Sequence, residues 1–195
     1  MHGLINRSIQ CFLRDTYGDA LWLDVAAAAD LPFVEFEAML VYEDALTGRV
    51  LDAAAVKLKK TRAMVLEDIG TYLVSHPNNE GLRRLLRFAG LGYEDFLHSL
   101  DDLPDRTRLA VSDLDLPELE LRQHSASRYS ITCSAGFPGF GHVLVGILRA
   151  MADDYGALVI LDHMGEAQRV ETVEVTLVET AFAEGRAFEL GGKAG

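Results

Sequence analysis

The hydrophobic periodicity of this chain changes partway along, and that change limits the folds that the chain can adopt. In the first half, apolar side chains recur every three or four positions, as Ile5, Ile9 and Leu13 do, which is typical of amphipathic helices. Further on, apolar and polar residues alternate over 116–121 and 129–133, which is typical of half-buried strands. Helices followed by strands predict an α+β fold.

Start and stop signals divide the first part into short helices. Gly18 follows the first helix as a common C-terminal stop, Thr61 can cap the N-terminus of a later one, and Pro104 is expected to end the last. The predicted helices cover residues 4–17, 19–29, 42–58, 61–75, 79–88 and 93–103.

The second part is expected to form a mostly antiparallel, four-stranded sheet with one helix inserted. The first hairpin pairs residues 116–121 with 129–133, and the strongly apolar segment 140–155 is the inserted helix. The second hairpin pairs 157–163 with 170–178 and is expected to turn at Gly165-Glu166-Ala167.

One domain is expected over residues 1–182, with the helical part up to about residue 104 and the sheet with its helix over about 116–180. Residues 183–195 include Gly191-Gly192 and are expected to form a flexible tail. Asp153 and Asp154 stand near the C-terminus of the inserted helix, where the helix dipole disfavours negative charge. We therefore expect both side chains to be exposed.

The composition excludes several classes of protein. A net charge of −12 argues against binding to nucleic acid or to an anionic membrane surface, because both require clustered Lys and Arg. No segment reaches the ~18–20 apolar residues of a membrane span, and the N-terminus lacks the pattern of a signal peptide. Two cysteines, Cys11 and Cys133, cannot form a disulfide framework. We expect a cytoplasmic protein of bacterial type.

Motifs of common enzymes are also missing from the sequence. It has no Gly-rich phosphate loop of the known spacing, no His-Glu-x-x-His and no Gly-x-Ser-x-Gly. The Gly-rich run from Gly136 to His142 precedes a helix, but it contains no Lys or Arg and is explained by loop geometry. We do not expect an enzyme.

Several segments together carry a resemblance to one family. They read MHGLINRSIQCFLRDTYGDALWLDV, YEDALTGRVLDAAA, LEDIGTYLV, EGLRRLLRFAGLGYEDFLHSLDDL and GFGHVLVGILRAMADDYG. In this order they are similar to the H-NOX (heme-NO/oxygen-binding) domains, the heme sensors of soluble guanylate cyclase and of bacterial signalling proteins. The similarity extends over about residues 1–180. It implies the H-NOX fold, a heme cofactor and a role in sensing gases.

At the position of the iron ligand, this chain departs from the family. H-NOX domains carry a histidine after the Leu-Asp-x-Leu motif, and its imidazole binds the heme iron from the proximal side. Here the motif is followed by Pro104. Proline offers no lone pair to a metal, so the bond that holds and tunes the iron is missing.

The family's clamp for the heme propionates is missing as well. H-NOX domains carry a Tyr-x-Ser-x-Arg motif, in which Arg pairs bidentately with carboxylate. The matching positions here are Cys133, Ala135 and Phe137, and Arg128 lies too far back along the strand to replace the Arg. Loss of both parts predicts that heme is not bound conventionally.

The residues that match the family's distal pocket are all aliphatic: Ile5, Ile9, Leu73, Val143 and Ile147. Two interpretations stay open. Ordinary core packing is favoured, because apolar residues at helical spacing usually form a core. Alternatively, they line a pocket for a small apolar ligand, or the cavity is refilled by larger side chains such as Phe137.

Heme b would require an alternative axial ligand, either Cys133 or a histidine. A thiolate can bind heme iron, but a lone buried Cys usually behaves as a small hydrophobe. His98 precedes Pro104 by six positions and should face elsewhere on the helix. Surface or capping roles are expected for His124, His142 and His163.

These observations leave three hypotheses. The first is a regulatory domain without conventional heme that acts through a signalling partner, which the resemblance implies to be a cyclase, a histidine kinase or a cyclic-di-nucleotide enzyme. The second is a heme-based gas sensor with a different axial ligand. The third places a lipid-like or other apolar ligand in the former heme cavity.

Overall fold

The computed structural model describes residues 1–188 except 89, 113, 115 and 135. Its helices are α1 (Gly3–Tyr17), α2 (Asp19–Ala28), α3 (Asp44–Leu58), α4 (Arg62–Ser75), the 3₁₀ helix η1 (Pro77–Asn79), α5 (Glu80–Arg87), α6 (Tyr93–His98), α7 (Leu103–Ala110) and α8 (Phe140–Tyr155). Its strands are β1 (Glu118–Ser125), β2 (Arg128–Ser134), β3 (Leu158–Ala167) and β4 (Val170–Glu179). The α+β fold predicted from the sequence is confirmed.

The capping signals in the helical part act as predicted. The Thr61 hydroxyl accepts a hydrogen bond from the Met64 N–H at 3.2 Å and begins α4. Gly18 adopts a φ of 90° between α1 and α2, a conformation that an L-residue with a side chain rarely reaches. Its own N–H donates to the Arg14 carbonyl, so the turn between the two helices leaves this donor satisfied.

The prediction that Pro104 ends a helix is wrong. Helix α6 already ends at His98, a turn follows, and α7 begins at Leu103 with Pro104 in its first turn. An N–H in the first turn of a helix has no intrahelical partner, so proline is tolerated there. The carboxylate of Asp101, within the turn, accepts a hydrogen bond from the Leu121 N–H of strand β1 at 2.7 Å. This contact fixes the turn against an edge of the sheet.

The four strands form one antiparallel sheet in the order β1-β2-β4-β3. Both predicted hairpins are present, but the turn of the second is misplaced. The strands continue through Gly165, where the β3–β4 register shifts, and the chain turns at Gln168 and Arg169. Both turn residues have positive φ, at 54° and 64°, as two-residue hairpin turns of type I′ require.

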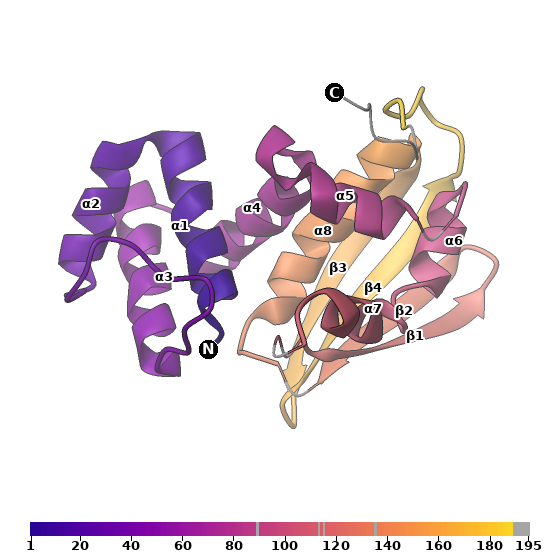
Figure 1. Cartoon of the computed structure of the whole chain (residues 1–195). Coiled ribbons are helices and arrows are strands. Elements are labelled where there is room, and N and C mark those ends of the chain that lie inside the picture. The colour runs from indigo at the N-terminus through magenta and orange to yellow at the C-terminus, as the bar shows by residue number, and fades with distance from the viewer. Residues whose placement is uncertain (89, 113, 115, 135, 189–195) are drawn as a thin grey trace.

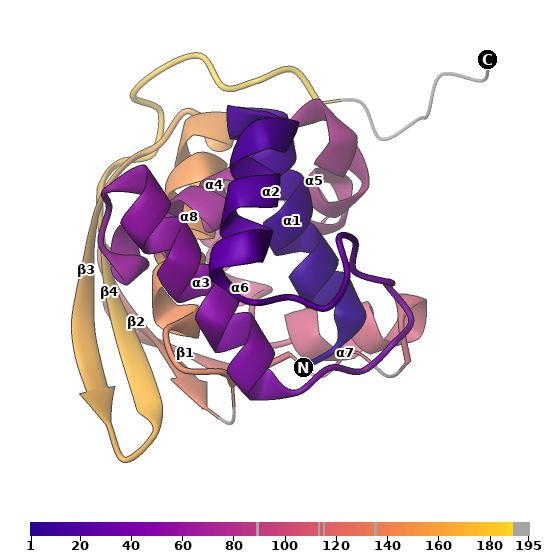
Figure 2. The ribbon, with the colours of Figure 1, turned by 90° about the vertical axis from the view of Figure 1, so that its left-hand side faces the viewer.

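Helices α4 and α8 join the helical group to the sheet (Figures 1 and 2). They cross at glycines: a Cβ atom at Gly70 would clash with the Val143 carbonyl, and one at Gly146 with the Glu67 carbonyl. The glycines therefore allow the two backbones to touch. On its other face α8 packs against the sheet, whose inward residues include Ile131, Val173 and Val175, each no more than 1% exposed.

Asp154 is fully buried, contrary to the expectation from the sequence, whereas Asp153 is exposed. The Asp154 carboxylate lies 2.8 Å from Nε of Arg83 and 3.5 Å from Nε of Arg87. Two arginines from α5 thus compensate a charge that the dipole of α8 disfavours.

The segment expected to be a flexible tail is described up to residue 188. Within it, the Ala183 N–H donates to the Gly156 carbonyl and the Arg186 N–H to the Asp154 carbonyl. Arg83 also donates to the Ala187 carbonyl at 3.1 Å. Among the described residues, no helix combines the length and the apolar character that a membrane crossing requires.

Candidate functional site

Pro104 is buried near the N-terminus of α7. Its ring nitrogen is part of the peptide backbone, so the residue has no side-chain atom that could bind a metal. The turn before it is held on β1 by Asp101, as described above.

Cys133 lies on β2 and is 3% exposed, with its side chain on the sheet face that packs against α8. Glu171 is its cross-strand neighbour on β4. Burial, with a smaller contribution from the negative charge of Glu171, raises the pKa of Cys133 to about 12. Both effects disfavour the thiolate, which is the form that binds a metal.

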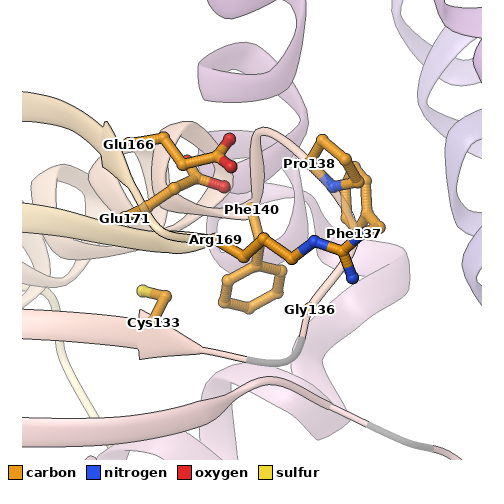
Figure 3. A pocket seen from close by; sticks show the side chains of 8 residues that line it. All are labelled: Cys133, Gly136, Phe137, Pro138, Phe140, Glu166, Arg169 and Glu171. Atoms are coloured by element: carbon orange, nitrogen blue, oxygen red, sulfur yellow. The ribbon is translucent and has the colours of Figure 1, made fainter.

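Phe137 follows β2 and is half buried, with its ring edge-to-face with Phe140 at a centroid distance of 6.2 Å. Ala135, the third position expected to match the clamp, lies outside the described residues. Cys133 and Phe137 both line one cavity of about 240 Å³ (Figure 3). The remaining residues of its wall are Gly136, Pro138, Phe140, Glu166, Arg169 and Glu171.

The charged residues of this cavity come from the second hairpin and were not expected from the sequence. Glu166 lies near the end of β3 and Arg169 in the turn that follows it, and both are exposed. Among the described residues neither side chain has an ion-pair or hydrogen-bond partner. A guanidinium thus reaches the region of the predicted clamp from about 30 residues further along the chain, which periodicity could not reveal.

Glu171 is a buried carboxylate that caps the N-terminus of α8. Its Oε1 accepts from the Gly139 N–H at 2.8 Å, and its Oε2 accepts from the Gly141 N–H at 3.0 Å. A negative charge is stabilised at this end of a helix by the unpaired N–H groups and the dipole. The Nε2 atom of His163 lies 2.9 Å from the same Oε2.

The hydrogen bonds of His163 define its tautomer. The Gly165 N–H donates to Nδ1 at 3.2 Å, so Nδ1 carries no proton and Nε2 donates to Glu171. Both ring nitrogens are therefore engaged, and neither is available to a metal.

His142, on α8, stacks on His163 with ring centroids 4.0 Å apart and an interplanar angle of 16°. Its Nδ1 lies 3.5 Å from the Glu67 carboxylate of α4, which also pairs with Arg149 at 2.9 Å. The stacked rings join α4, α8 and the second hairpin. This cluster was not predicted, because its members come from segments far apart in the sequence.

The remaining candidate histidines have other surroundings. His98 is exposed and lies edge-on to Tyr129 at 6.0 Å, and His124 is exposed and contacts the Ser130 hydroxyl at 2.8 Å. A surface or capping role was expected for His124, and His98 was expected to face away from Pro104.

The five residues proposed for an apolar pocket belong to the packed interior or to its border. Ile9, Val143 and Ile147 are 3%, 6% and 7% exposed within the hydrophobic core. Ile5 and Leu73 are partly buried and pack against that core. None of the five lines the cavity at Cys133 and Phe137, which is the arrangement expected of ordinary core residues.

Comparison with known proteins identifies the family. The sequence profile of the haem-NO-binding family, HNOB, matches residues 2–163. This chain belongs to the H-NOX family. The matched region is the H-NOX domain, which is the sensor domain of this family.

Curated relatives of this H-NOX domain are guanylate cyclases. It is 22% identical over 168 residues to "Soluble guanylate cyclase 89Db" of Drosophila melanogaster, and 25% identical over 195 residues to "Soluble guanylate cyclase gcy-34" of Caenorhabditis elegans. These alignments cover 86% and 92% of this chain but only 25% and 28% of the relatives. The chain thus spans about a quarter of the length of the relatives it matches.

Solved structures share the fold. An oxygen-binding H-NOX domain related to soluble guanylate cyclases superposes with a TM-score of 0.70 at 14% identity, covering 96% of this chain and 100% of that one. An H-NOX protein from S. oneidensis in the Fe(II)NO ligation state superposes with a TM-score of 0.74 at 12% identity, covering 91% and 99%. At these identities the likeness establishes the H-NOX fold alone.

Proposed function

We propose that this H-NOX domain does not hold heme by conventional ligation and that it regulates a signalling partner by binding a ligand or that partner directly. The proposal rests on Pro104, which occupies the position where the resemblance places the family's proximal histidine. An iron porphyrin without a strong axial donor loses the bond that retains it.

Candidate replacement ligands are poorly suited to iron. Burial and the negative charge of Glu171 disfavour the thiolate of Cys133, the form that would bind iron, and raise the pKa of its thiol. His163 uses both ring nitrogens in hydrogen bonds. His98 is exposed at the C-terminus of α6, and the turn between α6 and α7 separates it from Pro104 in the sequence. These observations support the loss of conventional heme binding, and they weaken the alternative of a gas sensor with another axial ligand.

The charges around the predicted clamp also disfavour heme propionates. Phe137 stands where the resemblance places the clamp Arg, and the cavity that it lines contains two carboxylates, Glu166 and Glu171. Like charges at close range repel in a partly buried site. Arg169 offsets only one of them.

The cavity is also small for heme. Its volume of about 240 Å³ is below the roughly 300–1,000 Å³ of pockets that bury drug-sized ligands. Heme is a larger molecule than most of these ligands.

The partner is proposed by class. Curated relatives carry this domain as about a quarter of a soluble guanylate cyclase. We therefore place this domain upstream of a cytoplasmic cyclase, histidine kinase or cyclic-di-nucleotide enzyme. Its own sequence contributes the regulatory module and no catalytic motif.

Visible spectroscopy tests this proposal. The chain is expressed with added heme precursor beside a heme-binding H-NOX domain as positive control, and both are passed through gel filtration. The expected result is a colourless protein without a Soret band. A Soret band that stays with the protein and shifts on addition of NO would refute the proposal, and Cys133→Ala and His142→Ala would then locate the axial ligand.

A further inference from the structure

The cavity at Cys133 and Phe137 carries opposite charges at two places on its wall. Figure 3 shows the carboxylates of Glu166 and Glu171 close together, whereas the guanidinium of Arg169 extends away from them towards Phe137. The aromatic side chain of Phe140 also lines this cavity. A site of this kind distinguishes ligands by the number and the sign of their charges.

The negative part of the wall has unused capacity to accept hydrogen bonds. A carboxylate offers about four acceptor positions. Glu171 fills three of them, with the N–H groups of Gly139 and Gly141 and with His163. Among the described residues, its Oε1 accepts from Gly139 alone. Glu166 has no partner among the described residues, so a donor on a ligand can bind to both carboxylates.

The positive part of the wall is also unpaired. Arg169 has no carboxylate or carbonyl partner among the described residues, although its guanidinium carries five N–H donors. The geometry of these donors matches a carboxylate bidentately. A ligand carboxylate placed beside Arg169 would be kept away from the two glutamates.

Size and apolar surface limit the ligand further. The volume of about 240 Å³ admits only a small molecule. Phe137 and Phe140, at right angles with centroids 6.2 Å apart, present aromatic surface for an apolar body. The neutral thiol of Cys133 adds no charge.

We propose that this cavity binds a small zwitterion, an amino-carboxylate with an apolar body. Its ammonium group contacts Glu166 and Glu171, its carboxylate pairs with Arg169, and its apolar part packs on Phe137 and Phe140. The inference rests on the proposed function, because heme propionates bound at the same place would exclude this ligand. It adds to that function the class of ligand to which the domain responds.

A matched set of ligands tests the two charges separately. Isothermal titration and ¹⁵N NMR are carried out on the full chain with phenylalanine and 4-(aminomethyl)benzoate as zwitterions, 4-methylbenzylamine as the cation and 4-methylbenzoate as the anion. We expect at least one zwitterion to bind with a Kd below about 1 mM, and both single-charge compounds to bind about tenfold more weakly or worse. Shifted amide signals should cluster in residues 136–141 and 166–171.

Variants connect binding to the named side chains. Arg169→Gln should reduce zwitterion affinity about tenfold and leave the affinity for the cation unchanged, and Glu166→Gln should weaken the zwitterion and the cation alike. Arg122→Gln is the control, because Arg122 is exposed on β1, pairs with Glu120 at 3.0 Å and lies outside the cavity. Circular dichroism checks that each variant is folded.

The outcomes separate this inference from the proposed function. A visible spectrum is recorded on every sample before titration. No binding of either zwitterion by a colourless protein, or binding that Arg169→Gln leaves unchanged, overturns the inference alone. A heme Soret band in the same sample overturns the proposed function as well.

Discussion

Cys133 illustrates at the scale of one residue how neighbouring groups determine the chemistry of a side chain. Its sequence position suggested an alternative heme ligand, but burial and the nearby Glu171 favour the neutral thiol. Neither effect can be read from the sequence, because the burial depends on packing by α8 and Glu171 comes from another strand.

The raised pKa predicts a pH dependence of stability. The thiol ionises near its ordinary value of 9.0 in the unfolded chain and near 12 in the folded one. The unfolded state therefore loses its proton first, so the stabilisation is complete below about pH 9 and is lost as the pH rises towards 12. Urea unfolding of wild type and Cys133→Ala at about pH 7.5 and about pH 10.5 measures this.

The wild type should lose more free energy of unfolding between these pH values than Cys133→Ala does. Tyrosines that ionise in the same range are common to both proteins, so their contribution cancels in the comparison. Equal losses in the two proteins would contradict the assignment.

Asp154 gives a second prediction at this scale. Asp154→Asn removes a fully buried charge, so that Arg87 loses its carboxylate partner and Arg83 keeps only Glu80, 3.3 Å away. Breaking a buried ion pair in this way costs about 3–5 kcal/mol. Asp153→Asn, at the exposed neighbouring position, should change the free energy of unfolding by less than about 0.5 kcal/mol. Similar effects of the two substitutions in urea unfolding would show that the buried pair is not stabilising.

At the scale of elements, the crossing of α4 and α8 depends on glycine. Gly146→Ala would direct a methyl group at the Glu67 carbonyl, a backbone atom that cannot move aside. We expect a destabilisation of about 3 kcal/mol, measured by urea unfolding. Gly48→Ala is the matched control: Gly48 lies within α3 and a Cβ there meets no atom within 4 Å.

Because alanine favours helix more than glycine does, Gly48→Ala should stabilise the protein by about 0.5–1 kcal/mol. Opposite signs for the two substitutions are thus expected. A Gly146→Ala protein as stable as the wild type would mean that the helices can separate without loss.

Local signals predicted most elements but failed where a tertiary contact decided the outcome. Gly18 and Thr61 acted as the cap signals indicate. Pro104 was misread because proline can either follow a helix or begin one, and the contact between Asp101 and β1 favours the second. Gly165 was assigned to a turn but lies at a register shift. Two hairpins were predicted, whereas the pairing of β2 with β4 that joins them has no local signal.

At the scale of the whole molecule, one core connects the helical part to the sheet. The same buried cluster contains Trp22 of α2, Leu66 of α4 and Ile131 of β2. We therefore expect a single cooperative unfolding transition. Trp22, the only tryptophan, is 1% exposed and donates to the Val34 carbonyl at 2.8 Å, so its fluorescence reports on the helical end.

The fluorescence of Trp22 and the far-UV circular dichroism should change together in urea, with coincident midpoints. A tryptophan transition that precedes the loss of ellipticity would mean that α1–α3 unfold separately, and that residues 1–182 are not a single cooperative unit.

The candidate site could be predicted only in part. Its positions on β2 and before α8 followed from the family resemblance, whereas Glu166, Arg169 and Glu171 are brought there by the sheet order. An argument along one segment cannot find such residues, because their proximity is a property of the complete fold.

The turn of the second hairpin has a consequence for engineering. Gln168 and Arg169 both hold a left-handed backbone that asparagine and glycine adopt at lower free energy. A search for thermostable variants would therefore select Asn-Gly at these two positions. That choice would remove the cavity's guanidinium, so the more heat-resistant protein would be the one that no longer distinguishes a zwitterion from a simple amine.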